Sequence, residues 1–308
     1  TKSSAASSAA AIRPPRRRTS NEADMNVFGL HTFAIAPVWD LARIEPQMDR
    51  LKELGIGLME IPLLRPEEID TKRTRGFANH YGVQLIPSLG LPRALDVVER
   101  PEEALDFLQP AFNVCNEVGA EALGGVTYGT IGKTTGRAPT QREIDGMCRF
   151  LERAAKSAKA RSLKLGIEPC NRYETHLINR GVDAARIIER IGADNIFIHL
   201  DTYHMHIEEE SFAAGFEAAA PFLGYVHVSE ANRGVPGRGM LNWAACMKAI
   251  ADIGYEGPIT LESMNHVDVD IAGGLAVWRP VAEDPRDVIE VGLPFLREEA
   301  KKAGLTLG

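Results

Sequence analysis

A repeating pattern limits what this chain can fold into: from Met25 onward, short apolar runs alternate with longer amphipathic stretches. The apolar runs are Asn26–His31, Gly57–Ile61, Val83–Ser88, Ala122–Tyr128, Leu163–Glu168, Ile196–Asp201, Gly224–Ser229 and Pro258–Glu262. Such runs, separated by helical patterns, are typical of parallel strands joined by helices. A closed barrel of this type needs eight units. The sequence therefore predicts an α/β protein, a single (β/α)8 TIM barrel.

The stretches between the apolar runs have the features of helices. Helices are expected over Leu41–Leu54, Pro101–Val118, Thr140–Ala160, Val182–Ile191 and Pro285–Ala303. Three of them stop before a glycine, Gly55, Gly119 or Gly192, which suits a left-handed helix cap. No linker or change of composition interrupts residues 25–308, so this range is predicted to form one catalytic barrel domain.

Residues 1–24 differ from the rest of the chain. Ser and Ala dominate, a cluster of arginines adds positive charge, and no acid precedes Glu22. Such a segment is expected to be a disordered extension, an organelle transit peptide, or sequence upstream of a start at Met25. The expected location is therefore the cytoplasm, or an organelle matrix if the segment is a transit peptide.

Composition argues against several classes of protein. The 308 residues are 44% hydrophobic and carry a formal net charge of −7. The chain can bury a large core but lacks the positive charge on which non-specific binding to nucleic acid depends. The four cysteines form no CxxC pair, and no apolar run approaches the roughly 18 residues of a membrane span. We expect neither a nucleic-acid nor a membrane partner.

Potential metal ligands stand at the ends of four successive candidate strands. They are Glu168, Asp201, His227 and Glu262, which lie 33, 26 and 35 residues apart, close to one strand-helix repeat each. Because the carboxyl ends of barrel strands share one mouth, these side chains are expected to converge. Three carboxylates and an imidazole suit one Mn²⁺, Mg²⁺ or Co²⁺ ion. A single carboxylate could instead cap a helix, but three buried together need a cation.

Several stretches of the sequence resemble a known family. They are Gly166–His176, Leu200–Phe212, His227–Gly239 and the pair Trp278-Arg279. Together they resemble the ketose 3-epimerases of the D-tagatose and D-psicose (D-allulose) type. The resemblance is strongest from Leu163 to Arg279. The first half of the chain agrees mainly in its strand and helix layout and in Glu60.

The resemblance implies a mechanism and assigns residues to it. In that family Mn²⁺ or Co²⁺ holds O2 and O3 of a free ketose. Two of the four metal ligands, here Glu168 and Glu262, would also act on C3, one removing the proton to give a cis-enediolate and the other returning a proton to the opposite face. The residues implied to bind substrate hydroxyls are Glu174, His204 and Arg233.

The same resemblance implies the substrate, the metal and the assembly. The substrate would be D-tagatose, D-fructose, D-psicose or a related ketopentose. One Mn²⁺ ion per chain is the expected cofactor, with Co²⁺ or Mg²⁺ as alternatives. The family also implies a homodimer or homotetramer.

The sequence departs from the family pattern near the sugar's far end. Relatives commonly place an aromatic side chain after the fourth strand, where this chain has Val126–Lys133, and Tyr128 is expected to take that place. At the first strand, His31 and Phe33 replace a cluster of Tyr and Trp. These differences affect the pocket for C4 to C6 more than the chemistry at C3.

Other polar residues are expected to be structural. His199 is predicted to pack in the core, and Glu208–Glu210 to be the solvated start of a helix. The segment Gly237–Gly239 is predicted to be a turn, because it lacks the spacing of a phosphate-binding loop. Arg233 could alternatively pair with Glu230 or another surface acid.

Three alternative functions remain open at this point. One is another metal-dependent barrel isomerase or dehydratase, similar to hydroxypyruvate isomerase or inosose dehydratase. The second is a repair nuclease similar to endonuclease IV, which the acidic net charge disfavours. The third is a sugar-binding barrel without catalysis, which the pair Glu168 and Glu262 disfavours.

Overall fold

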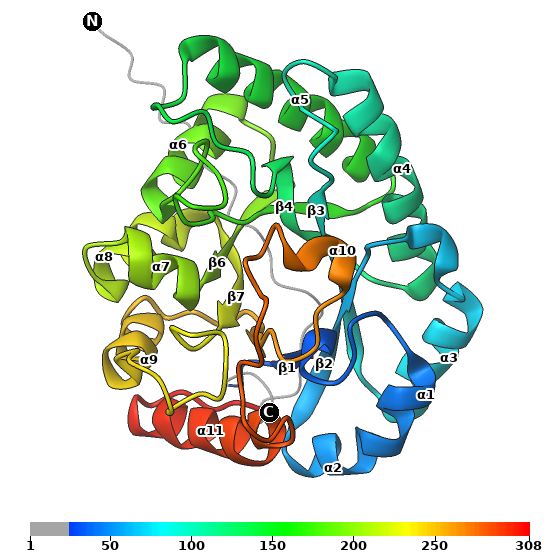
Figure 1. Ribbon diagram of the computed structural model, residues 1–308, viewed down its shortest axis with the longest axis vertical. Helices are drawn as coiled ribbons and strands as arrows, with labels where there is room; N and C mark the ends of the chain where they lie inside the picture. The colour runs from blue at the N-terminus through cyan, green and yellow to red at the C-terminus, as the bar shows by residue number, and fades with distance from the viewer. Residues whose placement is uncertain (1–24) are drawn as a thin grey trace, which may run out of the picture.

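The computed structural model describes residues 25–308, so the extension expected over residues 1–24 lies outside the described residues. Eight parallel strands close into a barrel in chain order, as predicted (Figure 1). They are β1 (Phe28–His31), β2 (Ile56–Pro62), β3 (Gln84–Leu91), β4 (Ala122–Thr130), β5 (Lys164–Ile167), β6 (Ile196–Asp201), β7 (Leu223–Val228) and β8 (Ile259–Leu261). Each overlaps the strand predicted for it.

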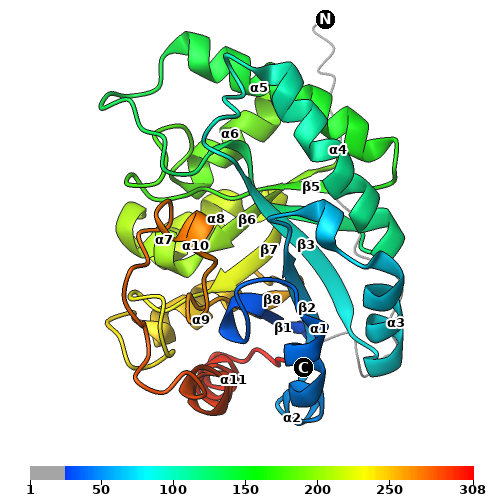
Figure 2. The same ribbon diagram turned by 45° about the vertical axis from the view of Figure 1, so that its right-hand side comes forward.

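Helices surround the ring of strands (Figures 1 and 2). They are α1 (Leu41–Ile44), α2 (Met48–Glu53), α3 (Thr71–Tyr81), α4 (Pro101–Val118), α5 (Gln141–Lys159), α6 (Gly181–Ile191), α7 (Thr202–Glu208), α8 (Phe212–Ala219), α9 (Trp243–Asp252), α10 (Val269–Ala272) and α11 (Leu293–Lys302). None of these helices of residues 25–308 is long and apolar enough to cross a membrane.

Two predicted helices are wrong in extent, and each has a proline in or next to the irregular turn. The stretch Leu41–Leu54 is interrupted by a 3-10 turn at Glu45–Gln47, where Pro46 supplies no N–H. The helix predicted over Pro285–Ala303 consists of a π-helical turn at Val288–Gly292 followed by α11, which has a proline in its first turn.

The inside of the barrel is filled at the end where the strands begin. There Val27, Leu58, Ile86, Phe197 and Tyr225 pack into one buried layer. A second, larger core lies between the strands and the helices. The layer inside the barrel leaves only the carboxyl ends of the strands for a pocket.

A bulge in β4 shifts the side chains that follow it. Gly125 has a φ of +93° and passes so close to the backbone of Leu89 that an added Cβ would overlap its carbonyl oxygen. The pairing of β4 with β5 changes register between Leu123 and Val126. Beyond the bulge, the simple alternation of inward and outward side chains no longer applies.

Candidate active site and metal centre

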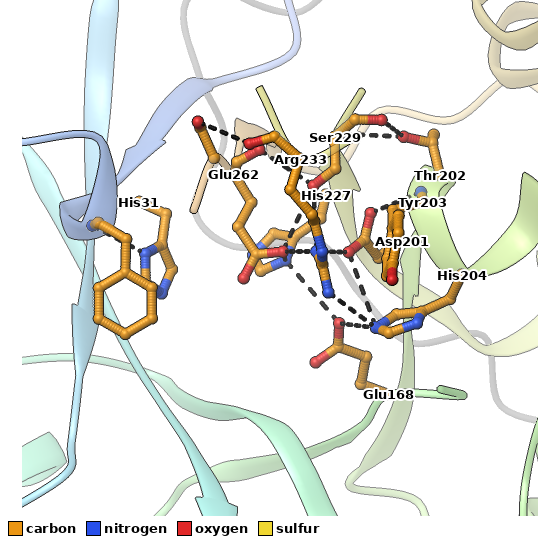
Figure 3. Close-up of polar contacts among 12 residues, drawn as sticks. His31, Glu168, Asp201, Thr202, Tyr203, His204, His227, Ser229, Arg233 and Glu262 are labelled. Atoms are coloured by element: carbon orange, nitrogen blue, oxygen red, sulfur yellow. Dashed lines mark hydrogen bonds and ion pairs between the residues drawn. The ribbon is translucent and has the colours of Figure 1, made fainter. Parts of the chain in front are cut away.

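The four predicted metal ligands come from consecutive strands and meet at the barrel mouth (Figure 3). Glu168 and Glu262 directly follow β5 and β8, Asp201 is the last residue of β6, and His227 lies in β7. All four side chains are buried. The carboxylates point into the space around His227 and Arg233 (Figure 3).

His227 is the common neighbour of the carboxylates. Its Nδ1 lies 3.5 Å from Oε2 of Glu262 and 3.9 Å from Oε1 of Glu168. Ligand atoms of Asp201, His227 and Glu262 lie within 4.8 Å of one another, and Glu168 forms a second such group with His227 and His199. The two groups share the imidazole of His227, and together they include all four predicted ligands.

Arg233 lies between two of these carboxylates. Its Nη1 donates to Oδ2 of Asp201 at 2.5 Å and also to Oε2 of Glu262. Its guanidinium carbon sits 3.9 Å from the centre of the Tyr203 ring. The buried guanidinium therefore neutralises part of the negative charge at the mouth and is held by stacking as well as by hydrogen bonds.

The loop after β7 aims Arg233 into the site. Arg233 has a φ of +61°, a left-handed conformation that a non-glycine residue adopts only when its surroundings hold it there. The backbone N–H of Met264 and the hydroxyl of Ser263 both donate to the Arg233 carbonyl. Strained backbone fixed by its neighbours in this way is typical of functional positions.

The side chain of Glu230 is not the partner of Arg233, which corrects one alternative. This buried carboxylate accepts hydrogen bonds from the backbone of its own loop, at Ala231, Gly237 and Leu241, and from the indole of Trp243. Gly237–Gly239 lies in an irregular turn, as predicted.

The predicted substrate-binding residues Glu174 and His204 are buried beside each other. Asn171 links them, since its side-chain amide donates to Oε1 of Glu174 at 2.9 Å and its backbone N–H donates to Nδ1 of His204 at 3.1 Å. Nε2 of His204 lies 3.8 Å from Oε1 of Glu168 and 3.3 Å from Nη2 of Arg233. The structure therefore brings all seven predicted site residues to one place.

Burial and mutual repulsion shape the charges of the site. Burial raises the pKa of Glu168 well above its ordinary value, and it also raises that of Asp201. For Glu262 burial acts in the same direction, but the neighbouring cations Arg233 and His227 outweigh it and lower the pKa. The cations among the described residues thus favour the ionised form of Glu262 more than that of Glu168 or Asp201.

The site opens into a pocket lined by polar and apolar side chains. The polar ones include Glu168, Glu174, His204, His227, Arg233 and Glu262. The apolar ones include Phe33, Leu64, Leu89, Val126, Ile131, Met264 and Leu275. The space, including its open mouth, measures about 550 Å³.

Tyr128 does not line this pocket, so the prediction for it is wrong. Its side chain is fully buried, and its hydroxyl donates to the backbone carbonyl of Ile178 at 3.0 Å. The bulge at Gly125 turns Val126 toward the pocket, and Ile131 completes that part of the wall.

Glu60 is a site residue whose role the sequence did not reveal. It lies within β2 and is fully buried, and its Oε2 is 2.5 Å from Nε2 of His227. An acid inside the apolar run Ile56–Pro62 was the available signal, because a buried carboxylate needs a partner. That partner lies five strands further along the chain.

The prediction for His199 is confirmed, and the prediction for Glu208 is wrong. His199 is fully buried against the rings of Tyr225 and His227, as predicted, and its Nδ1 also lies 3.7 Å from Oε2 of Glu168. Glu208 is the last residue of α7 and binds the side chain of Arg172, so the prediction of a solvated helix start there is wrong.

Comparisons with known proteins agree with this geometry. A family model described as a xylose isomerase-like TIM barrel matches residues 48–299. L-ribulose 3-epimerase of Methylomonas sp. (strain DH-1) is 32% identical over 277 residues, which cover 88% of this chain and 96% of the relative. Ketose 3-epimerase of Arthrobacter globiformis is 30% identical with the same coverage. A crystal structure of D-allulose 3-epimerase from Methylomonas sp. in complex with D-allulose superposes with a TM-score of 0.83 and 31% identity, covering 90% of this chain and 98% of that one.

The chain belongs to the xylose isomerase-like TIM barrel family. Within it, the relatives above place the chain among the ketose 3-epimerases, which are isomerases that act on carbohydrates. They do not favour the alternatives of a hydroxypyruvate isomerase or an inosose dehydratase.

Proposed function

We propose that this protein epimerises a free ketose at C3, with Glu168 and Glu262 as the catalytic pair. The observation that carries the proposal is that both carboxylates approach Nδ1 of His227 from strand ends separated by β6 and β7. Two acids that approach one centre from different sides can act on the two faces of one carbon. The identity to L-ribulose 3-epimerase and ketose 3-epimerase supports the same activity.

The residues at the mouth fit one divalent cation. Nδ1 of His227 has no hydrogen-bond partner among residues 25–308, although it is buried and faces two carboxylates. Glu168, Asp201, His227 and Glu262 would hold the ion. Three carboxylate ligands and one imidazole favour Mn²⁺, with Co²⁺ or Mg²⁺ as alternatives. When bound, the cation would withdraw electrons from the C2 carbonyl and stabilise negative charge on oxygen.

The proton transfers belong to the two glutamates. One takes the proton from C3, and the electron pair of the broken C–H bond moves into a cis-enediolate. The other then gives a proton to the opposite face of C3, which inverts that carbon. Their burial excludes bulk water from the reacting carbon.

Glu174, His204 and Arg233 are the proposed contacts to substrate hydroxyls. All three line the pocket next to the proposed catalytic pair. The apolar lining residues would receive the far end of the sugar, where hydroxyls find few partners. We propose D-fructose, D-psicose, D-tagatose or a ketopentose as substrate.

Proton exchange at C3, followed by NMR in D₂O, tests the reaction directly. With Mn²⁺ present, the wild type should exchange this proton and form the C3 epimer of at least one of D-fructose, D-tagatose, D-ribulose, L-ribulose and erythrulose. Glu262→Gln at saturating Mn²⁺ should lose at least about 10³-fold in rate, because an amide cannot transfer the proton. Glu208→Gln, at the Arg172 pair, is the matched control and should keep its rate. Full activity of Glu262→Gln would contradict the proposal.

The proposed assembly is a homodimer or homotetramer, with neither nucleic acid nor membrane as a partner. The net charge of −7 supports the proposed absence of nucleic-acid and membrane partners. Sedimentation of the purified protein measures its mass and tests the proposed oligomeric state.

A further inference from the structure

Glu60 has contacts that distinguish it from the other carboxylates of the site. It is fully buried, and its Oε2 accepts hydrogen bonds from the hydroxyl of Tyr225 at 2.7 Å and from Nε2 of His227 at 2.5 Å. With the carboxylate oxygen as the acceptor, Nε2 of His227 carries the proton of their hydrogen bond.

This hydrogen bond decides which nitrogen His227 presents to the mouth. With Nε2 bound to Glu60, Nδ1 is the nitrogen that faces Glu168 and Glu262. A ring rotated by half a turn would place a carbon there and break the bond to Glu60. The contact therefore fixes the orientation of the ring and the nitrogen available to an ion.

Residues on other strands hold the Glu60 side chain in place. The Tyr225 hydroxyl also lies 2.7 Å from Oγ1 of Thr260, so hydrogen bonds connect β2, β7 and β8. On the other side, Oε1 of Glu60 lies 3.7 Å from Nε2 of His31, and the rings of His31 and His227 face each other edge to face, 6.0 Å apart (Figure 3). A carboxylate fixed on several sides can fix the imidazole in turn.

We propose that Glu60 is a positioning residue for the metal centre: it orients His227 with Nδ1 toward the ion and increases the basicity of that nitrogen. The inference rests on the proposed function, because it assumes that His227 is a metal ligand. A carboxylate that accepts from the second nitrogen of a ligating histidine commonly has this effect, and its loss weakens metal binding roughly 10- to 100-fold. Glu60 itself does not touch the substrate in this proposal.

The test is the affinity for Mn²⁺ and Co²⁺, measured by calorimetry on the protein without sugar. Glu60→Gln keeps the size of the side chain and an oxygen acceptor but removes the charge, so Kd should rise roughly 10- to 100-fold. The visible absorption of bound Co²⁺, which reports the geometry of its ligands, should also change. Glu209→Gln is the matched control, because Glu209 accepts a hydrogen bond from the backbone of Gly181 away from the site, and it should bind both metals as the wild type does.

A second variant covers the case in which Glu60→Gln does not fold. Tyr225→Phe removes only the hydroxyl that holds Glu60 and leaves the aromatic ring of the buried layer in place. It should weaken metal binding in the same direction by a smaller factor, roughly 2- to 10-fold. Circular dichroism of each metal-free variant checks that it is folded.

The outcomes separate this inference from the proposed function. If folded Glu60→Gln and Tyr225→Phe both bind Mn²⁺ and Co²⁺ with wild-type affinity and an unchanged Co²⁺ spectrum, the positioning role is overturned while the proposed function stands. If the wild type itself binds none of Mn²⁺, Co²⁺ and Mg²⁺, the proposed function fails and the inference fails with it. Weaker binding together with an altered spectrum supports the role.

Discussion

His227 contacts carboxylates through both of its ring nitrogens, and its charge is sensitive to them. Burial favours the neutral ring, but Glu60 and Glu262 outweigh burial and raise the pKa of His227 well above 6.5. Without metal, the neighbouring carboxylates therefore favour the protonated form of the ring. A proton on Nδ1 and a metal ion on Nδ1 exclude each other.

This competition gives the metal affinity a predictable pH dependence. Below the raised pKa of His227, each bound ion must displace a proton, so affinity for Mn²⁺ should rise as the pH increases from about 6 to about 8. Calorimetry in buffers of different ionisation enthalpy counts the protons released, and at least one per ion is expected, because Glu168 and Asp201, whose pKa values are also raised, compete with the ion for protons as His227 does. An affinity that stays constant over this range, with no proton release, would argue against His227 as a ligand.

Among the structural elements, β4 shows how one glycine shapes the pocket. Gly125 and Gly82, the latter at the end of α3, both have left-handed backbones, with φ of +93° and +62°. Only Gly125 is crowded, by the backbone of Leu89, whereas a Cβ at Gly82 would meet nothing within 4 Å. Alanine at Gly82 would test the free-energy cost of a left-handed backbone alone. Alanine at Gly125 would add the cost of a steric overlap with Leu89.

Alanine at these two positions should have unequal effects. Gly82→Ala should lower the free energy of unfolding by about 1 kcal/mol, the cost of the left-handed backbone. Gly125→Ala should cost about 2 kcal/mol more, because the backbone of Leu89 must move. Urea unfolding of the metal-free variants measures both values. Equal losses would mean that β4 yields to the added methyl group without strain.

The elements also show what the sequence could and could not predict. Periodicity located all eight strands, and the rule that functional groups lie at the carboxyl ends of barrel strands located the four proposed metal ligands, because both depend on local pattern and on one known topology. The family resemblance supplied Glu174, His204 and Arg233. The position of Tyr128 was missed because the bulge at Gly125 breaks the alternation of side chains. The role of Glu60 was missed because its contact with His227 depends on barrel closure, which no local pattern shows.

For the whole molecule, a bound ion should contribute to stability. The proposed ligands lie on four strands that are assembled only in the folded barrel, so the ion would bind the folded state in preference to the unfolded one. With free Mn²⁺ at about 100 times its Kd, this adds about 2.7 kcal/mol. Removing the metal with EDTA should then lower the Tm by roughly 4 to 5 °C. Scanning calorimetry measures the shift, and an unchanged Tm would contradict a bound structural or catalytic ion.

The packed layer of Val27, Leu58, Ile86, Phe197 and Tyr225 closes one end of the barrel. A sugar can therefore reach Glu168 and Glu262 only through the opposite rim, and must leave by the same route. The substrate and its epimeric product use the same entrance and binding site, and they differ only in the configuration of one carbon. Each should therefore inhibit conversion of the other, and a preparation that starts from either sugar should slow long before it reaches the final mixture of the two.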